Sequence, residues 1–292
     1  MERVDIAIIG TGPAGVSAAL TAANRNKSIL LLGSRAMSEK VAKAHEIRNY
    51  PGLPSIRGED LAAAFRKHLE QAGIGITEQR VGAVYAMGDY FALQLGAEMR
   101  EAKAVILATG TVQANLLPGE KEWLGRGVSY CATCDAPLYR GKRAAVIGYS
   151  PREEAEAAFL SEVCSEVLYF PVYREETKLP ESVRVIREKV NGIEKEGSMI
   201  LRTAENLYSA DGVFVLREAA PPDQLVPGLE TEGPHVKVNR KMETNLPGVF
   251  ACGDLAGTPY QYIKAAGEGN VAAISASMWL DKNRKEKGGD AE

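Results

Sequence analysis

A glycine-rich turn directly follows the first strand-like segment of this chain. Residues Val4 to Ile9 are apolar, and they lead into Gly10-Thr11-Gly12-Pro13-Ala14-Gly15 and then into an alanine-rich helical pattern. In a G-x-G-x-x-G turn the first glycine permits a tight turn and the second lets a pyrophosphate approach the backbone. The third lets the helix pack against the strand. This start therefore predicts a dinucleotide-binding βαβ unit.

The same pattern of strand, turn and helix begins again roughly 140 positions later, at Arg143 to Leu160. Two such starts predict an α/β protein with two doubly wound, Rossmann-like domains, the second inserted in the first. Proline-containing stretches near Pro118 and Pro247 are plausible crossings between the domains. We therefore expect a discontinuous first domain of residues 1–112 and 246–292, and a central domain of residues 113–245.

Overall composition excludes some classes of partner. The 292 residues carry a formal net charge of −3, so nothing indicates a global attraction to nucleic acid or anionic membrane. The N-terminus shows no signal-peptide pattern, and no apolar run is long enough to cross a bilayer. A cytoplasmic protein is expected. The polar stretch 282–292 is expected to fray.

Only two of the four cysteines are close in sequence: Cys131-Ala132-Thr133-Cys134 is followed by Asp135. Two thiols separated by two residues can close a small disulfide, and C-x-x-C settings commonly lower a thiol pKa. Asp135 could carry a proton as the disulfide opens. The motif predicts a redox-active pair, with Cys131, Cys134 and Asp135 as the catalytic residues.

Zinc is the alternative use of a C-x-x-C pair. A structural zinc site needs four ligands, usually from two such pairs. This chain has one pair, two isolated cysteines and three scattered histidines, so no metal site is expected. Cys164 and Cys252 lie in apolar segments and are expected to pack as small apolar residues.

Two further apolar runs, 104–108 and 248–252, are stopped by Thr109-Gly110 and Gly253-Asp254, as in central strands that end at a ligand. Asp254 could bind the hydroxyls of a ribityl chain, or it could simply cap the segment that follows. The second strand, 29–32, ends in Gly33-Ser34 rather than in an acidic residue, so a ribose would need another partner.

These pieces together resemble the low-molecular-weight thioredoxin reductases over nearly the whole chain. The matching segments are 10–15, Asn49-Tyr50-Pro51-Gly52, Ala108-Thr109-Gly110, 127–135 and 247–254. The resemblance implies FAD in the first domain, a homodimer, and a central domain that rotates so that the cysteine pair meets flavin and substrate alternately. It also implies the cofactor-binding residues Gly10, Gly12, Pro13, Ala14, Gly15, Ser34, Lys40, Asn49, Thr109, Gly110, Gly253, Asp254, Gln261 and Tyr262. Lys40 falls where the family usually has glutamine.

The second glycine-rich turn departs from the family pattern. NADPH-dependent members carry G-x-G-x-x-A there and a His-Arg-Arg cluster after the next strand, whereas this chain has Gly148-Tyr149-Ser150-Pro151-Arg152-Glu153 and Pro171-Val172-Tyr173. Ser150 adds a side chain, Pro151 removes a backbone donor, and Glu153 adds a carboxylate near the phosphates. The combination is similar to the ferredoxin-dependent flavin thioredoxin reductases, which have lost the pyridine-nucleotide site.

This resemblance implies electron flow from reduced ferredoxin to FAD, then to Cys131 and Cys134, then to thioredoxin or a thioredoxin-like protein. Three alternatives stay open: an NADPH-dependent reductase with an atypical site, a redox-sensing flavoprotein without turnover, and a variant with a second flavin in the degenerate site. Because ferredoxins are usually acidic, a basic docking face is expected at Arg35, Lys40 and Lys43. The alternative there is an ordinary solvated surface.

Overall fold

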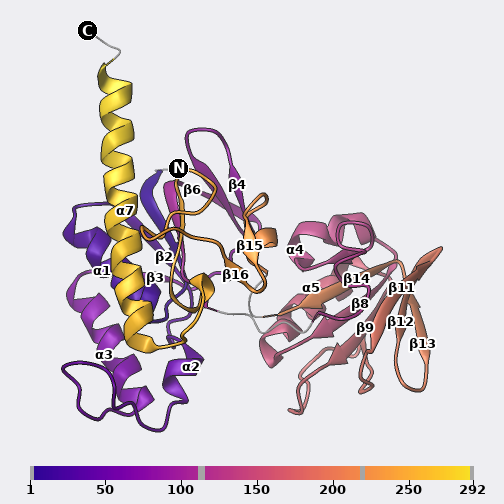
Figure 1. Ribbon diagram of the computed structural model, residues 1–292. Helices are drawn as coiled ribbons and strands as arrows, with labels where there is room; N and C mark the ends of the chain where they lie inside the picture. The colour runs from indigo at the N-terminus through magenta and orange to yellow at the C-terminus, as the bar shows by residue number, and fades with distance from the viewer. Residues whose placement is uncertain (1–2, 111–115, 218–220, 290–292) are drawn as a thin grey trace. The chain divides into compact units, whose positions relative to one another are not determined.

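The computed structural model describes residues 3–110, 116–217 and 221–289, and its chain divides into two compact units (Figure 1). The first unit comprises Met1–Gln113 and Pro221–Glu292, and the second comprises Ala114–Ala220. The predicted return to the first domain at residue 246 is therefore too late. Residues before 246 already bond to a strand of this unit, since Ala251 N–H donates to the Met242 carbonyl and Thr244 N–H donates to the Val249 carbonyl.

A seven-stranded sheet forms the centre of the first unit. Its parallel part runs in the order β3, β2, β1, β6 and β17. Two further strands continue from β6 as an antiparallel meander. The bounds are β1 Val4–Ile9, β2 Ile29–Leu32, β3 Ile76–Thr77, β4 Ala83–Ala86, β5 Phe91–Leu95, β6 Glu98–Leu107 and β17 Val249–Ala251. The central strands are apolar in their carboxyl-terminal parts, Ile6–Ile9 of β1 and Ala104–Leu107 of β6, because both faces of the sheet are covered there.

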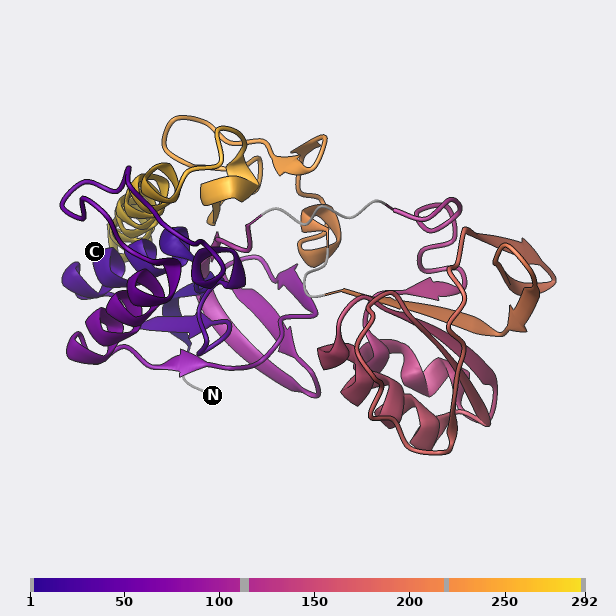
Figure 2. The same ribbon diagram turned by 90° about the horizontal axis from the view of Figure 1, so that it is seen from below.

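Helices cover this sheet, and Figures 1 and 2 show α1 and α7 side by side. A Cβ added to Gly269 of α7 would lie 2.0 Å from the Ala14 carbonyl oxygen of α1, so the two helices touch through backbone. The bounds are α1 Pro13–Asn24, α2 Glu39–Ala42, α3 Gly58–Gln71 and α7 Tyr262–Gly289. The expectation that residues 282–292 fray is wrong as far as Gly289, because the lysine, arginine and glutamate residues there are good helix formers.

The second unit is built on a five-stranded parallel sheet in the order β10, β9, β8, β14 and β7. Its strands are β7 Val128–Ser129, β8 Arg143–Gly148, β9 Glu166–Pro171, β10 Val183–Val185 and β14 Gly212–Leu216. The helical elements are α4 Ala132–Asp135, η1 Ala136–Tyr139, η2 Pro151–Glu153 and α5 Glu154–Val163. A small antiparallel sheet adds β11 Gly192–Glu196, β12 Ser198–Arg202 and β13 Leu207–Ala210.

The remaining short elements belong to the returning part of the first unit: α6 Pro222–Leu225, β15 Thr231–Glu232, β16 His235–Val236 and η3 Gly253–Ala256. Two parallel sheets, each with a strand–turn–helix start, confirm the predicted α/β fold class. Within the described ranges, no helix combines the length and apolar character needed to cross a membrane.

Candidate functional site

The first glycine-rich turn lies between β1 and α1 and can only be built from glycine. Gly10 has a φ of 121°, and a Cβ there would lie 2.2 Å from the Ala108 carbonyl oxygen. A Cβ on Gly15 would lie 1.8 Å from the carbonyl oxygen of Gly10. Backbone thus packs on backbone at both positions, which brings the N-terminus of α1 to the carboxyl edge of the sheet.

This helix N-terminus fits a bound pyrophosphate. Gly12 is the N-cap of α1, and no described side chain makes a capping hydrogen bond there. A Cβ on Gly12 would be in ordinary van der Waals contact with the Ser38 Cβ at 3.7 Å, so this position is less crowded than Gly10 or Gly15. The first turn of α1 also lacks an acidic residue. Free backbone N–H groups and an uncompensated helix dipole favour an anion at this position.

Other predicted residues meet at the same edge of the sheet. The Thr11 hydroxyl donates to the carbonyl of Ser34 at 2.9 Å, which ties the turn to the end of β2. Thr109 and Gly110 lie just after the end of β6, the parallel neighbour of β1. A Cβ on Gly253 would lie 2.9 Å from the Ala14 Cβ, so the end of β17 also reaches the start of α1.

A second group of predicted residues joins three distant segments. The Asn49 amide donates to Gln261 Oε1 at 2.6 Å, and the Tyr262 hydroxyl donates to the carbonyl of Lys40 at 3.0 Å. Lys40 Nζ lies 3.8 Å from Asp254 Oδ2. Burial, and then the charge of Asp254, raise the pKa of Tyr262. Asp254 thus lies near polar side chains that come from two other segments of the chain.

One ion pair at this site, between Lys264 and Glu268, could not be predicted from the sequence. Lys264 Nζ donates to the carbonyls of Gly253 at 3.0 Å and Gly257 at 2.6 Å, and it pairs with Glu268 at 3.0 Å. Glu268 in turn accepts the Gly253 N–H at 2.9 Å. The pair clamps the turn that carries Asp254. Its only signal in the sequence is an i,i+4 spacing of opposite charges, which is common on any helix surface.

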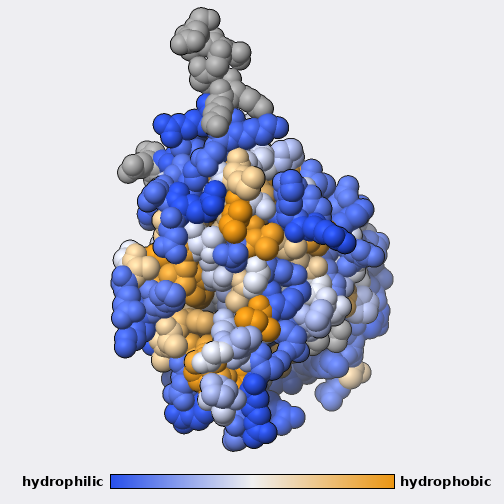
Figure 3. Space-filling model, turned by 60° about the vertical axis from the view of Figure 1, so that its left-hand side comes forward, coloured by the Kyte–Doolittle hydropathy of each residue, from blue (hydrophilic) through white to orange (hydrophobic). Residues whose placement is uncertain are grey.

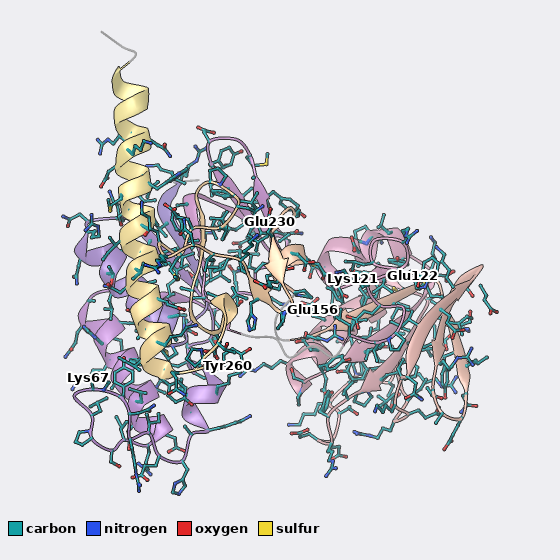
Figure 4. All side chains as sticks on the ribbon, in the orientation of Figure 1. Lys67, Lys121, Glu122, Glu156, Glu230 and Tyr260 are labelled. Atoms are coloured by element: carbon teal, nitrogen blue, oxygen red, sulfur yellow. The ribbon has the colours of Figure 1, made fainter. Side chains whose placement is uncertain are left out.

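The cysteine motif lies in the second unit, at the start of α4. Cys131 is disulfide-bonded, whereas Cys164 and Cys252 are free thiols. As predicted, both free thiols are buried, and burial raises the pKa of each. The Thr133 hydroxyl donates to Glu156 at 3.4 Å. Figure 4 labels Glu156 on α5. Within the described parts of the chain, no group of three or more His, Cys, Asp or Glu side chains could hold a metal ion.

Asp135, the third predicted catalytic residue, ends α4. Its N–H donates to the carbonyl of Cys131 at 3.3 Å, which closes one turn around the motif. The neighbouring Tyr139 has a raised pKa, first because of burial and then because of the charges of Asp135 and Asp211. Asp135 therefore lies within electrostatic reach of buried groups beside the motif.

The second glycine-rich turn is built differently from the first. Residues 151–153 form a 3₁₀ turn instead of opening directly into the helix, and Glu153 and Glu154 are buried, 4 % and 8 % exposed. The Tyr169 hydroxyl fills the space beside Gly148, where a Cβ would lie 2.1 Å from it. It bonds at 3.0 Å to the hydroxyl of Tyr173, which donates to Glu154. Carboxylates and tyrosines thus occupy a helix start that an anion would need.

Comparisons with known proteins agree with this architecture. The family model described as pyridine nucleotide-disulphide oxidoreductase matches residues 4–269. The thioredoxin reductase of Aquifex aeolicus (strain VF5) is 32 % identical, with 96 % of this chain and 94 % of the relative covered. The thioredoxin reductase of Bacillus subtilis (strain 168) is 30 % identical, with 95 % of both chains covered.

Solved structures extend the likeness. A ferredoxin-flavin thioredoxin reductase from Clostridium acetobutylicum is 47 % identical, with a TM-score of 0.92 over 97 % of this chain and 99 % of that one. A thioredoxin reductase from Gloeobacter violaceus is 30 % identical, with a TM-score of 0.79 over 96 % and 95 %. The first glycine-rich turn fits the cofactor of such enzymes. The chain belongs to the pyridine nucleotide-disulphide oxidoreductase family, as a thioredoxin reductase-like flavoprotein whose cofactor is FAD.

Proposed function

We propose that this protein is a ferredoxin-dependent flavin thioredoxin reductase that does not use NADPH or NADH. Electrons enter from reduced ferredoxin, pass to the Cys131/Cys134 pair and leave to thioredoxin or a thioredoxin-like protein. The observation that carries the proposal is the contrast between the two glycine-rich turns. The first turn of α1 is free of acidic residues, whereas two buried glutamates, Glu153 and Glu154, lie at the start of α5.

The charges at the second turn oppose a pyridine nucleotide. A unit charge about 4 Å from a phosphate charge costs on the order of 1 kcal/mol even at the dielectric constant of water, and more where water is excluded. Glu153 and Glu154 would each contribute such a term. The segment Pro171-Val172-Tyr173 also offers no cation to the 2′-phosphate of NADPH.

A flavin suits the proposed junction, since FAD can accept electrons singly and release them in pairs. Gly12 and the backbone N–H groups that follow Pro13 would hold its pyrophosphate. Asn49, Asp254, Gln261 and Tyr262 are the proposed contacts of the remaining polar atoms. Asp135 is proposed to hold and return the proton as the disulfide opens and closes.

The names of the matching relatives support thioredoxin and ferredoxin as the two protein partners. The Aquifex and Bacillus relatives are thioredoxin reductases, and the Clostridium structure is described as a ferredoxin-flavin enzyme. The residues of the second glycine-rich turn do not suit a pyridine nucleotide. They therefore also favour a protein that donates single electrons.

An anaerobic titration that follows flavin absorbance tests the proposal. Reduced ferredoxin should bleach the flavin within the time of one catalytic cycle, and stoichiometric NADPH or NADH should leave it oxidised over the same interval. Full bleaching by NADPH would instead identify an NADPH-dependent reductase in which Arg152 or Arg174 rebuilds the anion site. Failure to reduce any thioredoxin, although ferredoxin reduces the flavin, would indicate a redox-sensing flavoprotein. A flavin-to-chain ratio near two would indicate a second flavin in the degenerate site.

A homodimer is also proposed. Helix α7 exposes large apolar side chains at Ile263, Val271 and Met278, which are 39 %, 37 % and 60 % exposed. Figure 3 shows apolar patches on the side of the first unit that carries α7. Burial of such a surface is a common reason for a chain to self-associate. Sedimentation of the FAD-loaded protein at micromolar concentration tests whether it is a dimer.

The cytoplasmic location expected from the sequence stays a prediction.

A further inference from the structure

A buried charge network lies close to the cysteine motif in the second unit. The Glu120 side chain is 0 % exposed, and Arg217 is 5 % exposed as a residue. Both guanidinium ends of Arg217 donate to the Glu120 carboxylate, one of them at 2.7 Å. The Glu120 carboxylate also accepts the Leu117 N–H at 2.8 Å and the Tyr130 hydroxyl at 2.7 Å. This carboxylate is therefore fully hydrogen-bonded.

Parallel strands bring these residues together. Tyr130 follows β7, Arg217 follows β14 and Tyr149 follows β8, and all three strands end at the same edge of one sheet. The Arg217 guanidinium lies over the Tyr149 ring, 4.3 Å from its centroid, and donates to the Tyr149 hydroxyl at 3.1 Å. Burial alone would lower the pKa of Arg217, but hydrogen bonds to Glu120 and its charge hold that pKa above its ordinary value.

Tyr130 connects this network to the redox motif because the next residue is Cys131. On the other side of Tyr130, Ser129 Oγ accepts the Cys131 N–H at 3.1 Å and donates to the Cys131 carbonyl at 3.2 Å. The backbone that leads into the motif is thus held at two places. One is the hydroxyl of Tyr130 and the other is the hydroxyl of Ser129.

A buried ion pair seldom stabilises a fold more than well-packed apolar residues would, so its presence here agrees with a positional role. Two thiols form a disulfide more readily when their backbone is already held in the required geometry, because less freedom is lost on closure. We propose that Tyr130, anchored by the Glu120–Arg217 pair, is a positioning residue that favours the disulfide state of the Cys131/Cys134 pair. This inference rests on the proposed redox function of that pair.

Equilibration of the FAD-loaded protein with glutathione under anaerobic conditions tests the inference. Two molecules of glutathione supply two electrons and two protons, the protein disulfide becomes a dithiol, and one molecule of oxidised glutathione forms. Acid quenching, alkylation and mass spectrometry of the peptide that contains both cysteines measure the equilibrium constant. We expect Tyr130→Phe to lower the constant for disulfide formation by about threefold to tenfold, since the dithiol gains freedom.

Tyr149→Phe is the matched control. It removes one hydroxyl from the same Arg217–Glu120 network, but that hydroxyl lies on a turn remote in sequence from Cys131. We expect its constant to equal that of the unmodified protein within twofold. Ser129→Ala, which removes the second anchor and leaves the ion pair intact, should shift the constant in the same direction as Tyr130→Phe. If Tyr130→Phe does not retain FAD, the result for Ser129→Ala tests the positioning role instead.

An unchanged constant for the anchor variants, or an equal shift for Tyr149→Phe, would overturn the positioning role. Failure of the proposed function has a different signature. In that case the unmodified protein itself would show no reversible dithiol–disulfide exchange, or would not reduce thioredoxin.

Discussion

The side-chain amide of Asn49 donates a 2.6 Å hydrogen bond to Gln261, although the two residues are 212 positions apart. This contact joins the loop before α3 to the residue that immediately precedes α7. Tyr262 makes a second link between the same regions, through the carbonyl of Lys40. The polar end of the proposed FAD site is therefore assembled by the return of the chain to the first unit after the second unit has been completed.

Loss of either cysteine of the motif should abolish disulfide reduction without loss of the cofactor. The proposed FAD contacts all lie in the first unit, whereas Cys131 and Cys134 lie in the second. Thioredoxin reduction, measured with reduced ferredoxin as donor, should fall to background in Cys131→Ser and Cys134→Ser, and the flavin spectrum should remain. Cys164→Ser, at a buried free thiol, should keep its activity. Residual turnover in either motif variant would contradict the assignment.

Removal of the Lys264 clamp should weaken FAD binding. The Lys264 ammonium holds two carbonyls of the turn that carries Asp254, and hydrogen bonds to charged groups contribute about 1.5–3 kcal/mol each. Because the group is partly exposed, we expect Lys264→Met to raise the dissociation constant of FAD roughly tenfold. The fluorescence of the released flavin measures this dissociation constant.

Lys27→Met serves as the control for this clamp, since Lys27 pairs with Asp281 of the same helix α7 and does not touch the turn. A similar loss of FAD affinity in both variants would mean that general destabilisation, and not the turn, is responsible.

Reversal of charge at the proposed ferredoxin face should slow electron entry. Lys40 contacts Asp254, so its replacement would disturb the cofactor site as well. Arg35 and Lys43 are exposed and are the better test residues. Stopped-flow reduction by ferredoxin should be several-fold slower in Arg35→Glu/Lys43→Glu at low salt, with a weaker dependence on ionic strength.

Arg25→Glu/Arg100→Glu reverses the same number of charges away from this face, at the end of α1 and near the start of β6. This control should keep both the rate and the salt dependence of the unmodified protein. Equal behaviour of the two double variants would indicate an ordinary solvated surface at Arg35 and Lys43.

The tyrosine pair at the second turn should make stability decrease at alkaline pH. Burial raises the pKa of Tyr169 to about 12; the charges of Glu154 and Glu153 add to this, and its hydrogen bond with Tyr173 partly opposes it. A raised folded-state pKa contributes stability that is complete below the unfolded value near 10 and is lost as pH rises toward 12. The folded protein binds the proton more tightly than the unfolded chain throughout that interval.

Urea unfolding at pH 9 and pH 11 measures this effect. Tyr169→Phe cannot ionise, so it should lose about 1 kcal/mol less than the unmodified protein between these two pH values. Tyr85→Phe, at a tyrosine that is 43 % exposed, is the control and should follow the unmodified protein. An identical pH dependence in Tyr169→Phe would show that this hydroxyl does not stay protonated in the folded state.

The sequence alone determined the features that depend on local chemistry. Gly10 and Gly15 identify the first turn because only glycine permits the backbone contacts made there. The C-x-x-C pair followed by Asp135 indicates redox chemistry without reference to any other segment. The defects at Ser150 and Glu153 could likewise be recognised, since each stands where the first turn has a glycine. Resemblance to a family then indicated Asn49, Gln261 and Tyr262, which belong to no short motif with a physical meaning of its own.

Only the tertiary structure decided the contacts between distant segments. The return to the first unit at Pro221, the Lys264 clamp and the Glu120–Arg217–Tyr130 network each join residues whose pairing no local pattern reveals. The ends of parallel strands converge at one edge of a sheet, so residues 68 positions apart, such as Tyr149 and Arg217, become neighbours there. Local periodicity predicts a strand and where it ends, but the partner of a buried charge depends on the order of strands in the finished sheet.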